Sequence, residues 1–522
     1  MKSLNVNIKR SLPFLNIKRL YGINLLACLM LLAGCTKNFE KINTDPTRLA
    51  TLSSTDLRSL FPGSIVQTFV GTSYWASALG PGLFSRQFAS TQVAHSFQRY
   101  LIPDFMPATI YKAWYGAMSP LQNIINATKD NSPTINAVAR IWKVFILHRA
   151  TDSWGPIIYS QIGSAGRVIT FDSQKDVYYD FFRELESADS LLKNNLGIPS
   201  FGDKDPIYHG NNSEWIKFGN TLRLRLAMRI SLVDPAKAKL EAEKAVSNGV
   251  MTDVSDNAFV TVSVANPNGM NFQTGWNEQR MSCEFESLFK GWNDPRMSKY
   301  WSPALTDGQY RGVRCGMTPA QQVIPQNSYD NNSNVSVYLQ PENMNTTPQT
   351  VMYTAEAYFA RAEGAVNGWD MGGTAKEFYE KGIESSMNTW GIIDPTVITT
   401  YINGTNLPTA LNDYYHTPAL TDIPVKFSDD PQKEREQIGT QKWIANFPMP
   451  HETWAEMRRS GYPKMYPLLN SDNPNVPVTE MIPRYLYPIS EHDNNLAGYQ
   501  TAVQELGAGG DLESTHVWWD VN

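Results

Sequence analysis

The residues that come nearest to a catalytic signature form an incomplete set for serine acyl transfer. Ser190 and Lys193 have the S-x-x-K spacing, and the tripeptide Ser-Asp-Asn occurs at 255–257 and 471–473, but the K-T-G element is missing. Ser190 also ends a segment whose apolar residues recur with helical spacing, so packing explains it. We therefore assign no catalytic residue and expect a protein that is not an enzyme.

Metal and cofactor motifs are equally sparse. Seven histidines show no spacing typical of a metal site, and the sequence has neither a P-loop nor a G-x-G-x-x-G fingerprint. The stretch 330–334 begins like a calcium loop, but Val335 replaces the turn glycine and Pro341 the closing glutamate. We expect no metal and no cofactor. Because a glycosidase carboxylate pair is set by three-dimensional separation, a secreted glycoside hydrolase remains the first alternative.

Aromatic side chains gather in the middle of the chain. The stretch GWNDPRMSKYWSPALTDGQYRG, residues 291–312, places rings among Asn, Asp, Arg and Gly. Flat rings stack on sugar faces, and amide and guanidinium groups form hydrogen bonds with hydroxyls; the same combination suits peptides. The alternative interpretation is that these rings fill a loop-rich core. The candidate ligand-binding residues are Trp276, Asn277, Trp292, Asn293, Trp301, Tyr310 and Arg311.

Helices must position these loops, because helical periodicity recurs on both sides of them. Ile110, Trp114 and Leu121 share one face, for example, and Thr374 is the expected N-cap of a later helix. We expect helices near 108–129, 133–150, 174–194, 214–232, 351–367 and 374–390, and residues 234–249 carry further start and stop signals. Helix pairs of this size are typical of tetratricopeptide-like repeats. The sequence therefore predicts a mainly α fold, a tetratricopeptide-like helical stack with long loop-rich insertions.

The domain organisation follows from these segments. Helical repeats occupy about 108–250 and 351–390, whereas about 251–350 and 391–440 are rich in Asn, Gly, Pro and aromatic residues. Long irregular segments are usually functional or disordered, and the aromatic content favours ordered, functional loops with little sheet. We expect a single domain over residues 54–522.

The N-terminus has the features of a bacterial lipoprotein precursor. Its first nineteen residues carry five basic side chains and no acidic one, and the apolar run at 20–34 is too short to span a bilayer. The sequence LAGC, ending at Cys35, resembles the lipobox, in which cleavage leaves the cysteine as an acylated N-terminus. Two or more acyl chains make a stable membrane anchor. We expect a signal peptide over 1–34, lipid attachment at Cys35 and a tether over 35–53.

Removal of that signal peptide would leave an acidic protein. It takes five of the 45 Lys and Arg residues and none of the 50 Asp and Glu residues. This balance argues against nucleic acid as a partner. Beyond the anchor, the remaining thiols are those of Cys283 and Cys315; an exported setting would permit them to pair but does not require it.

Six motifs, in order along the chain, resemble those of the SusD/RagB-type outer-membrane nutrient-binding lipoproteins. Residues 438–464 resemble the C-terminal signature of that family, and 482–495 resemble its final motif, with Tyr485 where Arg is common. The remaining matches are NTDPT after the lipobox, TDSWGPIIYSQ at 151–161, AEAYFARAEGAVNGW at 355–369, and NDPRM with YRGV in the middle of the chain. This last match fits the SusD-like 2 branch.

The resemblance implies a lipid-anchored, cell-surface protein of the Bacteroidota outer membrane. Such a protein captures oligosaccharide or peptide and delivers it to a SusC-type TonB-dependent transporter. The second alternative is a non-nutrient scaffold lipoprotein for envelope assembly.

The late motif also has a physical interpretation of its own. Glu452 and Glu456 lie early in a short helix and Arg458 and Arg459 late, which matches the helix dipole, and Gly461 ends the helix. We expect the two arginines to form structural ion pairs that hold the long loops to the helical stack, and not a ligand clamp.

Overall fold

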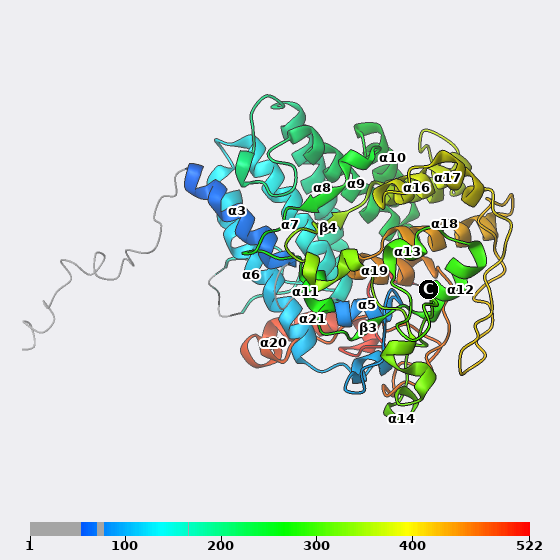
Figure 1. Cartoon of the computed structure of the whole chain (residues 1–522). Coiled ribbons are helices and arrows are strands. Elements are labelled where there is room, and N and C mark those ends of the chain that lie inside the picture. Colours follow the sequence, from blue (N-terminus) through cyan, green and yellow to red (C-terminus); the bar gives the residue numbers. More distant parts are fainter. Residues whose placement is uncertain (1–53, 70–77, 165, 167, 522) are drawn as a thin grey trace, which may run out of the picture. The chain divides into compact units, whose positions relative to one another are not determined.

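Stacked helices make up most of the structure (Figure 1), as the sequence predicted. The computed structural model describes residues 54–69, 78–164, 166 and 168–521. The expected signal peptide, Cys35 and the tether lie outside these described residues. Within the described part of the chain, no helix is both long and apolar enough to cross a membrane. The prediction of a mainly α, tetratricopeptide-like fold is confirmed.

The first half of the stack lies between residues 105 and 248, and each helix in it packs on the next along the chain. The predicted apolar faces are buried, as Ile110, Trp114 and Leu121 illustrate. Asp234 caps the last of these helices by accepting a hydrogen bond from the amide of Lys237, as its start signal predicted. The helices are α6 (Phe105–Thr128), α7 (Pro133–Trp154), α8 (Gln174–Lys193), α9 (Asn212–Arg229) and α10 (Pro235–Asn248).

The second half of the stack begins where α9 meets α15. Thr374 forms a capping box with Glu377, so the predicted N-cap is confirmed. Small residues allow α15 and α16 to approach closely: a Cβ at Gly382 would lie 2.8 Å from the ring of Phe359. The helices are α15 (Thr354–Val366), α16 (Ala375–Thr389), α17 (Pro395–Ile402), α18 (Pro431–Ala445) and α19 (Pro450–Ser460).

The 251–350 insertion contains four short α-helices, although we expected it to consist of loops. Ser282 caps α12 by accepting a hydrogen bond from the amide of Phe285, and two glutamates in the first turn favour the helix dipole. The apolar stripe of α12 faces inward, which explains why a short helix forms in this Asn-rich segment. The helices of the insertion are α11 (Gly269–Thr274), α12 (Cys283–Trp292), α13 (Met297–Tyr300) and α14 (Pro319–Gln322).

Strand is scarce among the described residues, as expected. Two antiparallel pairs form: β1 with β3 joins the insertion to the segment around residue 89, and β2 with β4 joins the two ends of the insertion to each other. The strands are β1 (Ala89–Ser90), β2 (Ala258–Val260), β3 (Gln279–Arg280) and β4 (Gln349–Met352). The remaining helices are α3 (Ser54–Phe69), α5 (Pro81–Phe84), α20 (Ile489–Asn494) and α21 (Leu496–Glu505).

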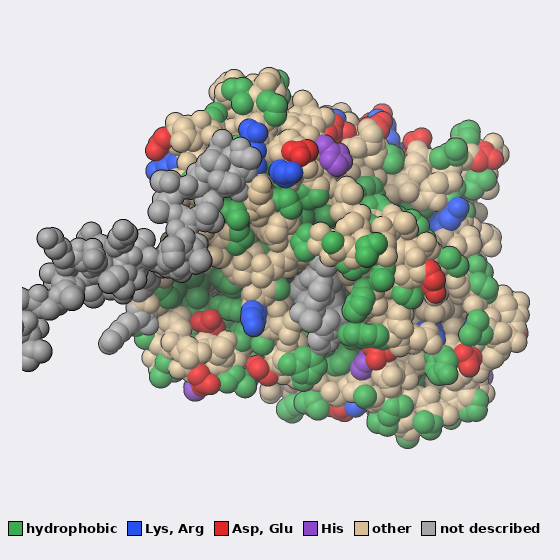
Figure 2. Space-filling model, turned by 60° about the vertical axis from the view of Figure 1, so that its left-hand side comes forward, with side chains coloured by type: hydrophobic (Ala, Val, Ile, Leu, Met, Phe, Trp, Pro, Cys, Tyr) green, Lys and Arg blue, Asp and Glu red, His purple; other side chains and the backbone are tan. Residues whose placement is uncertain are grey.

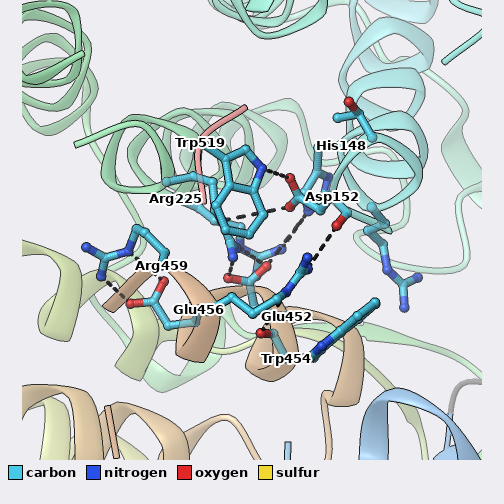
Figure 3. A network of polar contacts seen from close by, with 12 residues as sticks. His148, Asp152, Arg225, Glu452, Trp454, Glu456, Arg459 and Trp519 are labelled. Atoms are coloured by element: carbon cyan, nitrogen blue, oxygen red, sulfur yellow. Dashed lines mark hydrogen bonds and ion pairs between the residues drawn. The ribbon is translucent and has the colours of Figure 1, made fainter. Parts of the chain in front are cut away.

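A buried network of ion pairs crosses the stack (Figure 3). Glu452 of α19 lies between two arginines of α9, 3.3 Å from Arg225 and 2.5 Å from Arg229. Arg225 also pairs with Glu356 of α15 at 2.6 Å. Burial alone would raise the pKa of the Glu452 carboxyl, but the two guanidinium groups hold that pKa far below its usual range. The charges of three helices therefore satisfy one another in the interior.

His148 of α7 completes this network as a neutral ring. Its Nδ1 lies 3.2 Å from the carbonyl oxygen of Val144, and its Nε2 lies 3.5 Å from Arg225 Nη1. Burial lowers the pKa of His148, so the ring accepts from Arg225 and adds no further positive charge. His148 therefore contributes a hydrogen-bond acceptor, and not a charge, to the network.

The two arginines of the late motif have structural contacts, as predicted, but the ion pairs of Arg459 join helices and not the long loops. Arg459 pairs with Glu363 of α15 at 2.6 Å and with Glu456 on its own helix. Burial alone would raise the pKa of the Glu456 carboxyl. The positive charges of Arg459 and, to a lesser extent, Lys442 of α18 outweigh this effect and lower the pKa to about 2. Arg458 donates to the carbonyl oxygens of Asp152 and Pro483, which ties α19 to α7 and to the C-terminal segment.

Glu452→Gln should destabilise the protein strongly. The variant keeps the shape of the side chain but leaves Arg225 and Arg229 without their shared charge, and removing one partner of a buried pair costs about 3–5 kcal/mol. The matched control is Glu380→Gln, because Glu380 is a partly exposed residue of α16 whose ion pair with Lys376 is 3.9 Å long. Urea unfolding should show a change within about 0.5 kcal/mol for the control. Similar small losses in both variants would contradict this account of the network.

Candidate ligand-binding surface

The NDPRM motif attaches the 251–350 insertion to the helices. Arg296 is fully buried and donates to Asp294 Oδ2 at 2.6 Å, to Gln441 Oε1 of α18 at 2.8 Å and to Tyr401 of α17 at 3.0 Å. Its other terminal nitrogen donates to Ser386 of α16 at 3.0 Å. One planar guanidinium thus joins the loop to three helices, a geometry that Lys could not provide.

Two of the predicted stacking platforms are core residues instead. Trp301 is 1% exposed and packs edge-on against Phe88 and at a tilt against Phe447, and Trp292 is 5% exposed. Trp292 Nε1 donates to the carbonyl oxygen of Ile423 at 3.1 Å. Neither ring presents a face to solvent, so the expectation that they stack on a ligand is corrected in favour of the packing interpretation.

Three further candidates have structural contacts. Asn293 is the left-handed C-cap of α12, with φ of 53°. Arg311 pairs with Asp307 and donates to the carbonyl oxygen of Asn331 at 3.3 Å. Tyr310, next to it, is half-buried. The contacts of Asn293 and Arg311 are therefore with neighbouring parts of the insertion.

Trp276 and Asn277, by contrast, are presented to solvent. Trp276 is 47% exposed, and its ring meets the equally exposed Phe272 edge-on with centroids 6.2 Å apart. Tyr329 is 50% exposed and lies over Arg280, whose guanidinium carbon is 5.4 Å from the ring centroid. We call Phe272, Trp276 and Tyr329 the aromatic patch. Because folded monomeric proteins rarely expose large contiguous apolar patches, we take the aromatic patch as the candidate interaction site.

Arg280 of β3 forms hydrogen bonds with both segments that carry the aromatic patch. It is 1% exposed and donates to Asn277 Oδ1 at 2.9 Å and to the carbonyl oxygen of Tyr329 at 2.9 Å. Burial lowers the pKa of Arg280 to about 10, so the side chain remains charged at neutral pH. Asn334 also donates to Asn277 Oδ1, at 3.2 Å. Asn277 itself has φ of 57°, a conformation that Asn tolerates better than most residues.

A Ser–His–Glu alignment lies behind this turn. Pairing of β1 with β3 places Ser90 beside Gln279, and His95 Nδ1 lies 2.9 Å from Ser90 Oγ. His95 Nε2 is 3.4 Å from Glu278 Oε1. This order is that of a nucleophile, a base and an orienting carboxylate. Ser90 is only 1% exposed, however, and its Oγ accepts the amide of Gln92 at 3.1 Å, so no substrate atom reaches it.

The thiols do not form a disulfide. Cys283 and Cys315 are both free and buried, and burial raises the pKa of both, that of Cys315 to about 12. They are therefore inert core residues. Among the described residues, no group of His, Cys, Asp and Glu side chains could hold a metal ion.

Charged side chains of both signs are interspersed among hydrophobic and uncharged polar groups on the face that Figure 2 shows. Scattered charges of both signs do not produce the strong field that attracts a polyanion.

The arrangement defines a class of protein: a helical-repeat scaffold whose long insertion exposes aromatic side chains. The SusD-like family model, described as SusD and RagB outer membrane lipoprotein, matches residues 62–520. This chain therefore belongs to the SusD-like family. No curated protein sequence matches it.

Solved structures give the same result. A chitin-binding SusD homologue from Flavobacterium johnsoniae is 33% identical with a TM-score of 0.82, over 88% of this chain and 99% of that one. A SusD-like protein from Bacteroides thetaiotaomicron is 31% identical with a TM-score of 0.78, over 90% and 99% of the two chains. A structure described as a chitin-binding protein is 27% identical with a TM-score of 0.76, over 90% of this chain and 100% of that one.

Trp276→Ala and Trp301→Ala should differ in stability, because only one of these rings is exposed. Trp301→Ala leaves a cavity in the aromatic core and should cost about 3–5 kcal/mol in the free energy of unfolding. Trp276→Ala removes a half-exposed ring and should change it by less than about 1 kcal/mol. Urea denaturation followed by circular dichroism measures both. If Trp276→Ala destabilises as much as Trp301→Ala, the aromatic patch belongs to the core.

Proposed function

We propose that this protein is a cell-surface lipoprotein that captures oligosaccharide and delivers it to a SusC-type TonB-dependent outer-membrane transporter. The observation that carries the proposal is the aromatic patch, with half of each ring exposed and the Asn277 amide beside it. Membership of a family of outer-membrane binding lipoproteins supports it.

A glycan fits the patch better than a peptide does. Sugar rings have flat C–H faces that stack on Trp and Tyr, and their hydroxyl rims match the amides of Asn277 and Asn334. Two related structures are described as chitin-binding, which makes oligomers of N-acetylglucosamine the first ligands to test. Transfer to a transporter requires release, so we expect dissociation constants of roughly 1 μM to 1 mM, equivalent to about −8 to −4 kcal/mol.

Binding without catalysis is the role that the site chemistry favours. The Ser90 hydroxyl is buried, and its histidine is held by Glu278 behind the turn, away from the exposed rings. We infer that the alignment of Ser90, His95 and Glu278 braces the turn that carries Trp276 and Asn277. The proposed protein therefore presents its ligand unchanged to the transporter.

Titration calorimetry with the tetramer of N-acetylglucosamine tests the ligand class. Wild-type protein should bind it in the range given above, and Trp276→Ala should weaken binding by about 1–3 kcal/mol, as truncation of an interface aromatic does. The control is Phe105→Ala, because Phe105 is 52% exposed but lies at the start of α6. An uncharged tetrapeptide that binds in place of any glycan would contradict the proposal and favour the peptide alternative.

Cys35→Ala should abolish lipid attachment and release the protein from the membrane. Without the acylated cysteine, neither the charge nor the surface of the described domain provides a comparable anchor. Metabolic labelling with palmitate and fractionation of the envelope measure the effect, with Cys315→Ala as a buried-thiol control. A Cys35→Ala variant that still labels and sediments with the outer membrane would show that the anchor lies elsewhere.

A further inference from the structure

Two cavities lie beside α12, and neither is lined by Trp276 or Asn277. One has a volume of about 450 Å³ and the other about 520 Å³. Both are lined by Glu286, Lys290 and Asn412, so they form one continuous depression, which we call the α12 groove. Volumes of this size match those of sites for small ligands.

The walls of the α12 groove are fixed by close backbone packing. A Cβ at Gly291 would lie 2.3 Å from the carbonyl oxygen of Leu407 and 2.4 Å from Pro408 Cα, so only glycine admits the 406–413 segment. Ser287 and Thr409 then exchange hydrogen bonds, with Ser287 Oγ donating to Thr409 O at 2.7 Å and Thr409 N to Ser287 O at 3.0 Å. The groove is therefore preformed.

The carboxylates in the groove already have partners. Glu286 accepts from Lys290 Nζ at 2.7 Å and from the amide of Gly312 at 2.6 Å. Both oxygens of Asp413 accept from Thr417, at 2.8 and 2.7 Å.

The two arginines that line the groove also have protein partners: Arg311 pairs with Asp307, and Arg314 donates to Thr417 Oγ1 at 3.1 Å and to the carbonyl oxygen of Pro467 at 2.8 Å. A charged ligand of either sign would have to compete with these contacts, so the groove favours a neutral one.

Amide side chains supply the unused hydrogen-bonding capacity. The nitrogens of Asn327, Asn331 and Asn332 donate to backbone carbonyls, which leaves their side-chain oxygens as acceptors. The side chains of Gln309, Gln326 and Asn412 have no hydrogen-bond partner within the part of the chain that the structure describes, although all three line the groove. Each free carboxamide offers two donors and one acceptor from a single planar group.

We propose that the α12 groove is a second glycan-binding site, which holds a short neutral segment of the polysaccharide by amide hydrogen bonds and not by ring stacking. Neighbouring hydroxyls both donate and accept, which is what a carboxamide can match. A peptide would need apolar pockets for its side chains, whereas the groove is lined mainly by amides and by charged side chains that already have protein partners. This inference rests on the proposed function in assuming a glycan, but it concerns a site separate from the aromatic patch.

The number of oligosaccharides bound per protein tests the inference. Equilibrium dialysis should use labelled tetramers of N-acetylglucosamine, of β-1,4-linked glucose and of α-1,4-linked glucose, so that the result does not depend on one sugar. Wild type should bind two molecules of the preferred tetramer. Gln309→Ala/Asn412→Ala, in which both substituted side chains are exposed, should bind one, with at least a tenfold loss of affinity at the groove and unchanged affinity at the patch. The control is Gln504→Ala, an exposed amide on α21.

The outcomes separate this inference from the proposed function. One tetramer bound to wild type, lost in Trp276→Ala and unchanged in Gln309→Ala/Asn412→Ala, would overturn the second site and leave the aromatic patch in place. One tetramer retained in Trp276→Ala and lost in Gln309→Ala/Asn412→Ala would establish the groove and remove the patch. Binding of none of the three sugars would overturn both. Thermal unfolding midpoints within a few degrees of wild type show that each variant is folded.

Discussion

The position of Glu452 between Arg225 and Arg229 is the constraint on which the rest of the structure depends. The hydrogen-bonded pair of Arg229 and Glu452 joins residues 223 positions apart, and neither charge is exposed to solvent. A buried charge without its partner is strongly unfavourable, so α19 is stable in its place only when α9 is already there. The C-terminal signature therefore cannot be a separate folding unit, and its arginines and glutamates complete the core of the helical stack.

The same network extends to the loops. Lys442 of α18 pairs with Glu456 of α19 at 3.1 Å, and the preceding residue, Gln441, accepts from the buried Arg296 at the base of the insertion. Two adjacent residues of α18 thus contact α19 on one side and the base of the insertion on the other. Because Arg296, Gln441, Lys442 and Glu456 are all buried, these polar contacts fix the base of the insertion on the scaffold.

The sequence was sufficient to predict the helices of the stack, because apolar periodicity and capping residues are local signals. The stripe around Trp114, the cap at Thr374 and the end of α19 at Gly461 could all be read from neighbouring residues. The sequence was not sufficient to show that Trp276 is exposed and Trp301 is buried. Both lie in similar polar, glycine-containing stretches of sequence and differ only in what packs on them after folding. The role of Arg280 was also missed, because its partners Tyr329 and Asn334 are about 50 residues away in the chain. No local sequence pattern indicates contacts over such a separation.

Burial of Arg280 beneath an exposed turn explains how a loop can act as a binding surface. Its hydrogen bonds to Asn277 and to the backbone of Tyr329 order the turn before any ligand arrives, so less conformational entropy is lost on binding. The rings of the patch make few of these anchoring contacts. A change of ring at Trp276 should therefore alter which ligand is held without loosening the turn. Arg280→Lys should instead loosen the turn, because an ammonium group cannot form the planar set of hydrogen bonds that joins the turn to the Tyr329 segment. The patch would then lose its geometry while keeping every aromatic side chain.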